Sequence, residues 1–167
     1  VKFIVDCGLF QERKYSKNNE SLPFIPANID FCLVTHNHVD HVGRLPFLVS
    51  KGFDKEIFIS ETTSKLLPLA LEDSHKVLRD VAKRQNRPCL YTESDVAQTM
   101  KLIRPCKYNQ TVQIRPNIKA TFFQNGHLMG ATSILVQIGY PGYENINLFF
   151  TGDYNNKNMF FDVPPLP

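Results

Sequence analysis

The chain has 167 residues and a net charge of +3, and 43% of its residues are hydrophobic while 21% are charged. These values are close to globular averages and exclude a disordered, collagen-like or coiled-coil chain. One domain is expected, able to bury roughly two-thirds of its unfolded surface. The mildly basic balance permits nucleic acid as a partner but does not by itself argue for one.

Targeting and redox features favour a cytoplasmic protein. The sequence has no apolar run long enough to span a bilayer and no charged-then-apolar segment at its start, so we expect no membrane partner. The cysteines Cys7, Cys32, Cys89 and Cys106 form no Cys-x-x-Cys pair, and we expect them to be reduced and buried. The chain opens directly on an apolar strand and ends on the proline-rich FFDVPPLP, which suggests a segment cut from a longer protein.

Strand-like and helical patterns alternate along the chain. Apolar runs bounded by turn residues predict strands at 2–6, 29–35, 56–60, 111–115, 120–124, 132–138 and 146–151. Helical periodicity predicts helices at 42–50, 61–85 and 92–102, and the polar segment 11–28 predicts a loop. The continuous apolar run 29–35 is typical of a strand buried on both faces. Ser60 is expected to cap the second helix, and Thr92 with Asp95 to form a capping box at the third.

The strongest motif is HNHVDH at 36–41, directly after the buried strand 29–35. Three imidazoles and a carboxylate would be costly in a core, because each needs a polar partner or water. His36 and His38 lie on the same side of an extended backbone and can share one metal ion, whereas Asp40 and His41 can reach a second. Nitrogen and oxygen ligands of this kind suit zinc. The alternative is a solvated polar loop in which the histidines coincide by chance.

Three further ligand-type residues follow predicted strands: Asp6, His127 in NGHLMGA, and Asp153 in TGDY. Taken alone, His127 would more often be structural, and a Gly-Asp pair is an ordinary turn. Because each stands directly after a strand, we expect them to converge with the HNHVDH residues at one end of the sheet. Asp6 is expected to orient a ligand histidine rather than to bind metal.

Two other polar features are expected to be structural. His75 lies on the predicted helix 61–85 beside Lys76 and is expected at the surface, although a role near the cleft stays open. The lysines and arginines from Arg79 to Lys107 are mixed with acids, which favours a solvated helical face over a nucleic-acid patch.

These motifs resemble the metallo-β-lactamase superfamily. THNHVDHVG is similar to its HxHxDH signature, and DCG, GHLMGA and TGDY, in this order, resemble its β-CASP branch of RNA-processing nucleases. Within that branch the chain looks closest to the cleavage-and-polyadenylation and Integrator endonuclease type and its bacterial and archaeal relatives. The segment 156–159 (NKNM) departs from the eukaryotic pattern, which favours a bacterial-type member.

The resemblance implies an α/β fold (α+β), an αββα sandwich that is incomplete as given. Residues 1–167 would be a partial metallo-β-lactamase domain, truncated before the β-CASP insertion and the C-terminal part of the sandwich. Two zinc ions are implied: the first would bind His36, His38 and His127, and the second would bind Asp40, His41 and the bridging Asp153.

The function implied by the resemblance is a zinc-dependent hydrolase that cleaves RNA phosphodiester bonds by a hydroxide shared between the two metals, with Asp40 and Asp6 as its catalytic carboxylates. Without the family's last histidine ligand and the insertion, the fragment is expected to hold the second zinc weakly and to have low activity. One alternative is a thioester- or lactone-type hydrolase of the same fold, disfavoured because its thioesterase members usually place the third histidine in Pro-Gly-His-Thr. Another is a non-catalytic scaffold paralogue, disfavoured because such paralogues usually lose ligands.

Overall fold

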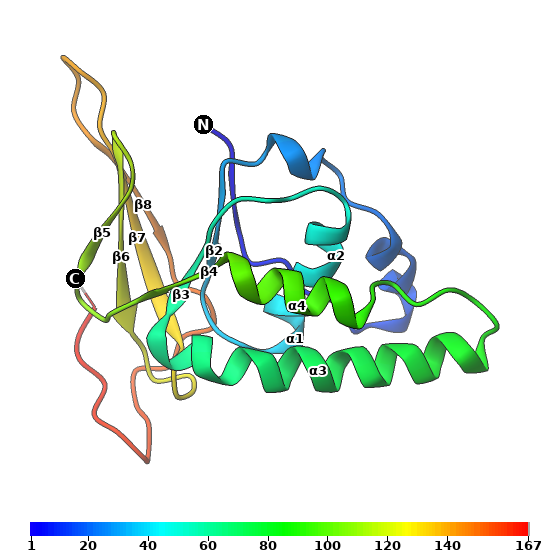
Figure 1. Cartoon of the computed structure of the whole chain (residues 1–167). Coiled ribbons are helices and arrows are strands. Elements are labelled where there is room, and N and C mark those ends of the chain that lie inside the picture. Colours follow the sequence, from blue (N-terminus) through cyan, green and yellow to red (C-terminus); the bar gives the residue numbers. More distant parts are fainter. Residues whose placement is uncertain (167) are drawn as a thin grey trace.

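Two four-stranded sheets packed face to face form the centre of the structure, a computed structural model that describes residues 1–166 (Figure 1). The first sheet is parallel, in the order β1 (Phe3–Val5), β2 (Phe31–Val34), β3 (Ile57–Ser60) and β4 (Ile103–Cys106). The second sheet is antiparallel, in the order β5 (Thr111–Arg115), β6 (Ile118–Gln124), β7 (Thr132–Ile138) and β8 (Ile146–Phe150).

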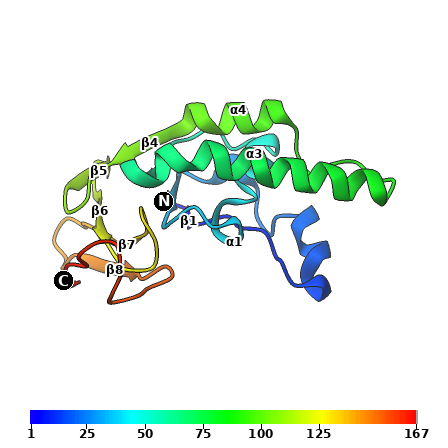
Figure 2. The ribbon, with the colours of Figure 1, turned by 90° about the horizontal axis from the view of Figure 1, so that it is seen from below.

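The helices lie against the face of the first sheet that points away from the second sheet. They are α1 (Val39–Val42), α2 (Leu45–Ser50), α3 (Glu61–Arg84) and α4 (Glu93–Leu102). Figure 2 shows α3 and α4 side by side over this face, and α3 also contacts β3 and β4. None of the helices in residues 1–166 is long and apolar enough to cross a bilayer.

The hydrophobic core has two parts, one on each face of the first sheet, and strand β2 contributes side chains to both. Successive side chains of a strand point to opposite faces, so Phe31 and Leu33 pack against the second sheet while Cys32 and Val34 pack against the helices. All four are fully buried, which confirms the prediction of a strand covered on both faces. The α/β class is also confirmed: within residues 1–166 the layers run helix, sheet, sheet, as in the first three layers of the predicted sandwich.

Several local predictions are confirmed. The strands 111–115 and 132–138 have the predicted bounds. The Oγ of Ser60 accepts a hydrogen bond from the backbone N–H of Thr63 and caps α3, and Thr92 and Asp95 form the capping box of α4.

Two local predictions are wrong, and one strand was missed. The helix predicted at 42–50 is two helices, because Gly43 ends α1 and α2 begins after Arg44 with Pro46 in its first turn, where proline is tolerated. The predicted loop 11–28 contains two 3-10 helices, η1 (Arg13–Glu20) and η2 (Pro26–Asn28). Strand β4 was not predicted, because its sequence IRPC has no apolar alternation and contains a proline, which only an edge strand tolerates.

The carboxyl ends of four strands meet at one edge of the sandwich. β1 and β2 run parallel, and β6 and β8 run in the same direction as each other because both are antiparallel to β7. The carbonyl of Thr35, just after β2, accepts hydrogen bonds from the backbone N–H and the Oγ1 of Thr132, at 2.9 and 3.0 Å. These bonds join the two sheets at the edge where the predicted ligand residues stand.

Ser60 provides a test of how this edge is held together. Its hydroxyl also donates to the carbonyl of Gly130, at 2.7 Å, and so joins α3 to the loop that follows β6. Ser60→Ala removes both the cap and this bond, and we expect it to lower the free energy of unfolding by about 1–2 kcal/mol in urea titrations. Ser64→Ala is the matched control, because that exposed hydroxyl bonds only the carbonyl of Glu61, and its effect should stay within about 0.5 kcal/mol. Equal losses in the two variants would contradict this assignment.

Candidate metal centre

Three imidazoles and one carboxylate converge beyond the ends of β2, β6 and β8. The Nδ1 of His38 lies 3.1 Å from the Nε2 of His36 and 3.1 Å from the Nε2 of His127. The Oδ2 of Asp153 lies 3.9 Å from the Nε2 of His36 and 3.5 Å from the Nε2 of His127. One ligand atom from each of these four residues lies within 4.8 Å of the other three.

This cluster fits a metal ion better than it fits a hydrogen-bond network. A proton on the Nδ1 of His38 could serve one neighbour, yet two ring nitrogens lie equally close to it. Two nitrogens bound to one tetrahedral zinc at about 2.0–2.1 Å are separated by roughly 3.3 Å. The nitrogens therefore stand near the separation that a shared cation requires.

A second group of ligand atoms lies on the other side of Asp153. The Nε2 of His41 is 3.4 Å from the Oδ1 of Asp153 and 4.0 Å from the Oδ2 of Asp40. The six residues expected to bind metal therefore lie together at one edge of the sandwich, as predicted: His36, His38, Asp40, His41, His127 and Asp153. Asp40 and His41 precede the predicted helix 42–50, but in the structure they belong to the short helix α1.

The carboxylate of Asp6 orients two of these histidines. Its Oδ2 accepts hydrogen bonds from the Nδ1 of His41 and the hydroxyl of Thr35, both at 2.7 Å, and its Oδ1 accepts from the backbone N–H of Thr35 at 2.8 Å. The Thr35 hydroxyl also lies 3.0 Å from the Nδ1 of His36. Because the hydroxyl proton goes to Asp6, this Nδ1 must be the donor, so His36 and His41 both keep Nε2 free to bind a metal. Asp6 thus accepts a bond from a predicted ligand histidine, as expected.

Burial and neighbouring charged groups shift the pKa of three of these imidazoles. Desolvation, followed by the neighbouring His41, His38 and His127, lowers the pKa of His36 to about 3, so its ring is neutral near pH 7. Burial also lowers the pKa of His127. Burial lowers the pKa of His41 as well, but the hydrogen bond to Asp6 and the charges of the nearby aspartates outweigh it and raise that pKa overall.

The DCG segment holds Asp6 against α1. The backbone N–H groups of Cys7 and Leu9 donate to the carbonyls of His41 and Val39, at 2.7 and 3.0 Å. A side chain at Gly8 would place its Cβ only 1.5 Å from the carbonyl oxygen of Asp40, so only glycine permits this approach. The glycine of this motif is therefore explained by contact between two backbones.

Thr35 and Asn125 are positioning residues that sequence reasoning missed. The fully buried amide of Asn125 accepts from the backbone N–H of His127 at 3.1 Å and donates to the carbonyl of Asp153 at 3.1 Å. It therefore joins the two loops that carry these ligand-type residues. An Asn directly after a strand, before Gly126, is the only signal in the sequence, and it is equally typical of an ordinary turn.

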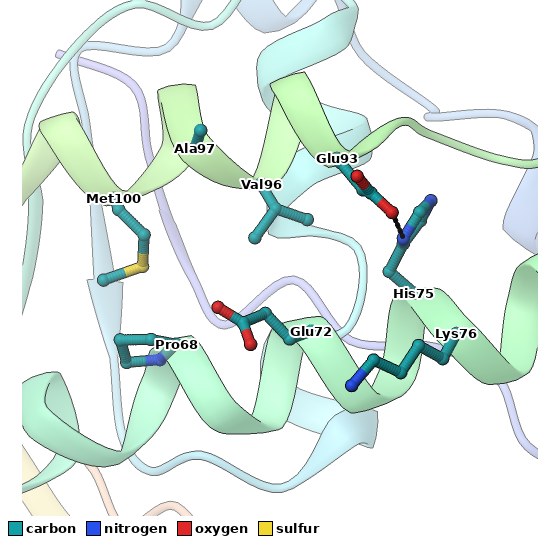
Figure 3. A pocket seen from close by; sticks show the side chains of 8 residues that line it. All are labelled: Pro68, Glu72, His75, Lys76, Glu93, Val96, Ala97 and Met100. Carbon is teal, nitrogen blue, oxygen red and sulfur yellow. Dashed lines mark ion pairs between the residues drawn. The ribbon is translucent and has the colours of Figure 1, made fainter.

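The prediction that His75 lies at the surface is wrong. Its exposed fraction is 5%, and its ring stacks on Tyr91 with the centroids 5.8 Å apart. Its Nδ1 lies 4.0 Å from the Oε1 of Glu93, and Figure 3 shows both beside a cavity of about 330 Å³ between α3 and α4, into which Glu72 points. None of the six ligand-type residues lines this cavity, so His75 is not part of the metal centre.

Comparison with known proteins agrees with this geometry. Residues 1–158 match the family model of the metallo-beta-lactamase superfamily domain, and the chain belongs to this superfamily. The fold alone is shared with Rm3 metallo-beta-lactamase, at a TM-score of 0.54 and 18% identity over 94% of this chain and 54% of that one.

Curated relatives confirm the RNA-processing branch to which the motifs pointed. The chain is 30% identical to ribonuclease TTHA0252 of Thermus thermophilus, covering 99% of this chain and 35% of that protein. It is 32% identical to endoribonuclease ysh1 of Aspergillus fumigatus (86% and 16% covered) and 31% identical to transcription termination factor FttA of Methanosarcina mazei (96% and 25%). The chain therefore spans about a third or less of the length of these relatives.

Asp6→Asn tests the orienting carboxylate. Asp6 adopts a positive φ of 62°, which asparagine tolerates, so the backbone should keep its conformation. The amide keeps only one acceptor oxygen, and we expect zinc affinity to fall roughly 10- to 100-fold in competition with a chelator. Asp54→Asn is the control, since that exposed carboxylate pairs only with Lys55. Unchanged zinc affinity in Asp6→Asn would show that the hydrogen bonds to Thr35 and His41 do not govern the site.

Proposed function

We propose that this protein is a metal-dependent hydrolase that cleaves RNA phosphodiester bonds with two zinc ions. The observation that carries the proposal is the position of the Asp153 carboxylate. Its Oδ2 faces His36 and His127, while its Oδ1 faces His41, so one side chain serves two groups of ligand atoms. A carboxylate shared in this way is what two adjacent metal ions require.

The ligand sets follow from this division. The first ion would bind His36, His38 and His127, and the second would bind Asp40, His41 and the shared Asp153. When bound, such a pair would supply Lewis-acid stabilisation of phosphoryl oxygens and would lower the pKa of water enough to provide a hydroxide nucleophile near neutral pH.

The chain's own residues hold the site ready for this chemistry. Asp6 keeps the proton of His41 on Nδ1, and the Thr35 hydroxyl does the same for His36. The fully buried His36 forms the dry side of the centre, whereas Asp40 and Asp153 are about half exposed and form its open side. In this proposal Asp40 contacts the reacting centre and is catalytic, while Asp6 acts through His41 and His36 and is a positioning residue.

RNA is the proposed substrate because the curated relatives named above carry the names ribonuclease and endoribonuclease. The open side of the centre supports a chain-like substrate, because a strand could reach metal ions held by the half-exposed Asp40 and Asp153 without having to enter an enclosed pocket. The likeness to β-lactamases supports the fold only and gives no preference for a small-molecule substrate.

Asp40→Asn separates the two proposed metal sites. Asp40 approaches His41 and belongs only to the second ligand group, so the variant should keep one tightly bound zinc per chain and lose the second. We expect hydrolysis of single-stranded RNA to fall roughly 100-fold or more, because one metal no longer stabilises the transferred phosphoryl group. The measurements are zinc titration and an RNA cleavage assay on the full-length protein, with Asp54→Asn as the exposed control.

Two results would contradict the proposal. Retention of two zinc ions of equal affinity by Asp40→Asn would show that the ligand groups are wrongly divided. A parent protein that hydrolyses a thioester or lactone but not RNA would show that the substrate class is wrong.

A further inference from the structure

We propose that Phe10, together with Tyr15, forms a stacking platform for an unpaired base of the RNA strand, next to the metal centre. The inference deepens the proposed function and rests on it for the identity of the strand. It starts from an apolar ring that the fold keeps exposed and holds firmly in place.

The backbone of Phe10 is clamped by a single side chain. Its N–H donates to the Oδ1 of Asn19 at 2.8 Å, and its carbonyl accepts from the Nδ2 of Asn19 at 3.0 Å. This reciprocal pair is typical of a segment whose position is fixed. Yet 41% of Phe10 remains exposed. The hydrogen bonds from Asn19 therefore fix the backbone of Phe10 without burying its ring.

Arg44 holds one face of the Phe10 ring. This arginine is buried, and its guanidinium donates to the carbonyls of Gly8, Asn18 and Ser21, which ties the whole segment to the start of α2. The same guanidinium lies 4.9 Å from the centre of the Phe10 ring and covers one of its faces. The exposed fraction of the ring must therefore come largely from its other face and edge.

Tyr15 extends this surface. Its ring centroid lies 6.4 Å from that of Phe10 at an interplanar angle of 56°, and 43% of Tyr15 is exposed. The ammonium of Lys14 lies 4.7 Å from the Tyr15 ring centroid. Two aromatic rings held beside two cations offer a surface on which bases stack.

The platform adjoins the metal centre on two sides. One hollow, of about 540 Å³, is lined by Phe10 together with Asn37 and His38. A second, of about 350 Å³, is lined by Phe10 and Tyr15 together with Asp40. The ring therefore stands between two hollows that each reach a residue of the HNHVDH motif.

The charges around the hollows favour a base over a phosphate. Asp73 lines the first hollow and Glu12 the second, and carboxylates repel phosphates. The amide groups of Asn37 and Gln11 can hydrogen-bond the edge of a base. Arg13 and Lys17 of η1 line neither hollow, so these two cations provide no phosphate site inside them.

The test compares variants at Phe10 in the full-length, zinc-loaded protein, all made in the Asp40→Asn background so that RNA is not cleaved during binding. The probe is a fluorescein-labelled single-stranded RNA of about 10 nucleotides. Phe10→Ala should weaken binding roughly 5- to 150-fold, Phe10→Trp should restore it, and Phe10→Leu should not, because leucine is apolar but cannot stack. Tyr143→Ala is the matched control, since Tyr143 is an exposed aromatic on the β7–β8 turn that should not affect binding.

A second measurement identifies the contact as a base. Two abasic versions of the same RNA are used. Each lacks the base of one of the two nucleotides that flank the cleaved bond. One of these oligonucleotides should bind the Phe10 parent as weakly as Phe10→Ala binds intact RNA, and Phe10→Ala should then cause no further loss.

Each outcome decides the matter. Cleavage is measured separately, in the protein that keeps Asp40. If that protein cleaves RNA but Phe10→Ala leaves binding unchanged, the platform is wrong and the proposed function stands. If Phe10→Leu binds as well as the parent, the ring packs against protein, and the base assignment is overturned. If the protein that keeps Asp40 does not cleave RNA and the Asp40→Asn background does not bind it, both proposals fail. Binding that depends on Phe10, without cleavage by the protein that keeps Asp40, would overturn the proposed function alone.

Discussion

The carboxylate of Asp6 is the contact on which the candidate metal centre depends. It accepts three hydrogen bonds, two from Thr35 and one from His41, and through the Thr35 hydroxyl it also fixes His36. An isolated imidazole next to a buried strand would be free to rotate and costly to desolvate. With its Nδ1 proton held, the ring presents one defined lone pair to the cluster. The other ligand atoms can share a metal ion with His36 and His41 only because these two rings are fixed.

The fold brings the remaining ligands to the same place through strand direction. The parallel sheet ends beside Asp6 and His36, and two strands of the antiparallel sheet, β6 and β8, end beside His127 and Asp153. Thr132 bonds the carbonyl of Thr35 and holds the two edges together. A one-residue shift in the pairing of β6 or β8 with β7 would move the loop that carries His127 or Asp153 relative to the rest of the edge. The packing of the two sheets therefore sets the relative positions of the loops that carry the ligands, and the proposed metal centre depends on those positions.

How much could be predicted from the sequence depended on how local each signal was. HNHVDH was decisive because four ligand-type side chains within six residues rarely occur together by chance, and the other ligands were found because each follows a strand. Thr35 and Asn125 could not be found, since their residue types are common and their partners lie far along the chain. The burial of His75 was missed because packing against Tyr91, and not helical periodicity alone, decides which face of α3 is covered.

Zinc K-edge X-ray absorption on the protein loaded with one equivalent of zinc tests the central claim most directly. Ligation by His36, His38 and His127 predicts only nitrogen and oxygen neighbours at about 2.0–2.1 Å, with scattering from three imidazole rings. Cys7 directly follows Asp6, but it is buried, and within residues 1–166 its thiol is not among the converging ligand atoms. A sulfur neighbour at about 2.3 Å, or the absence of imidazole scattering, would contradict the account.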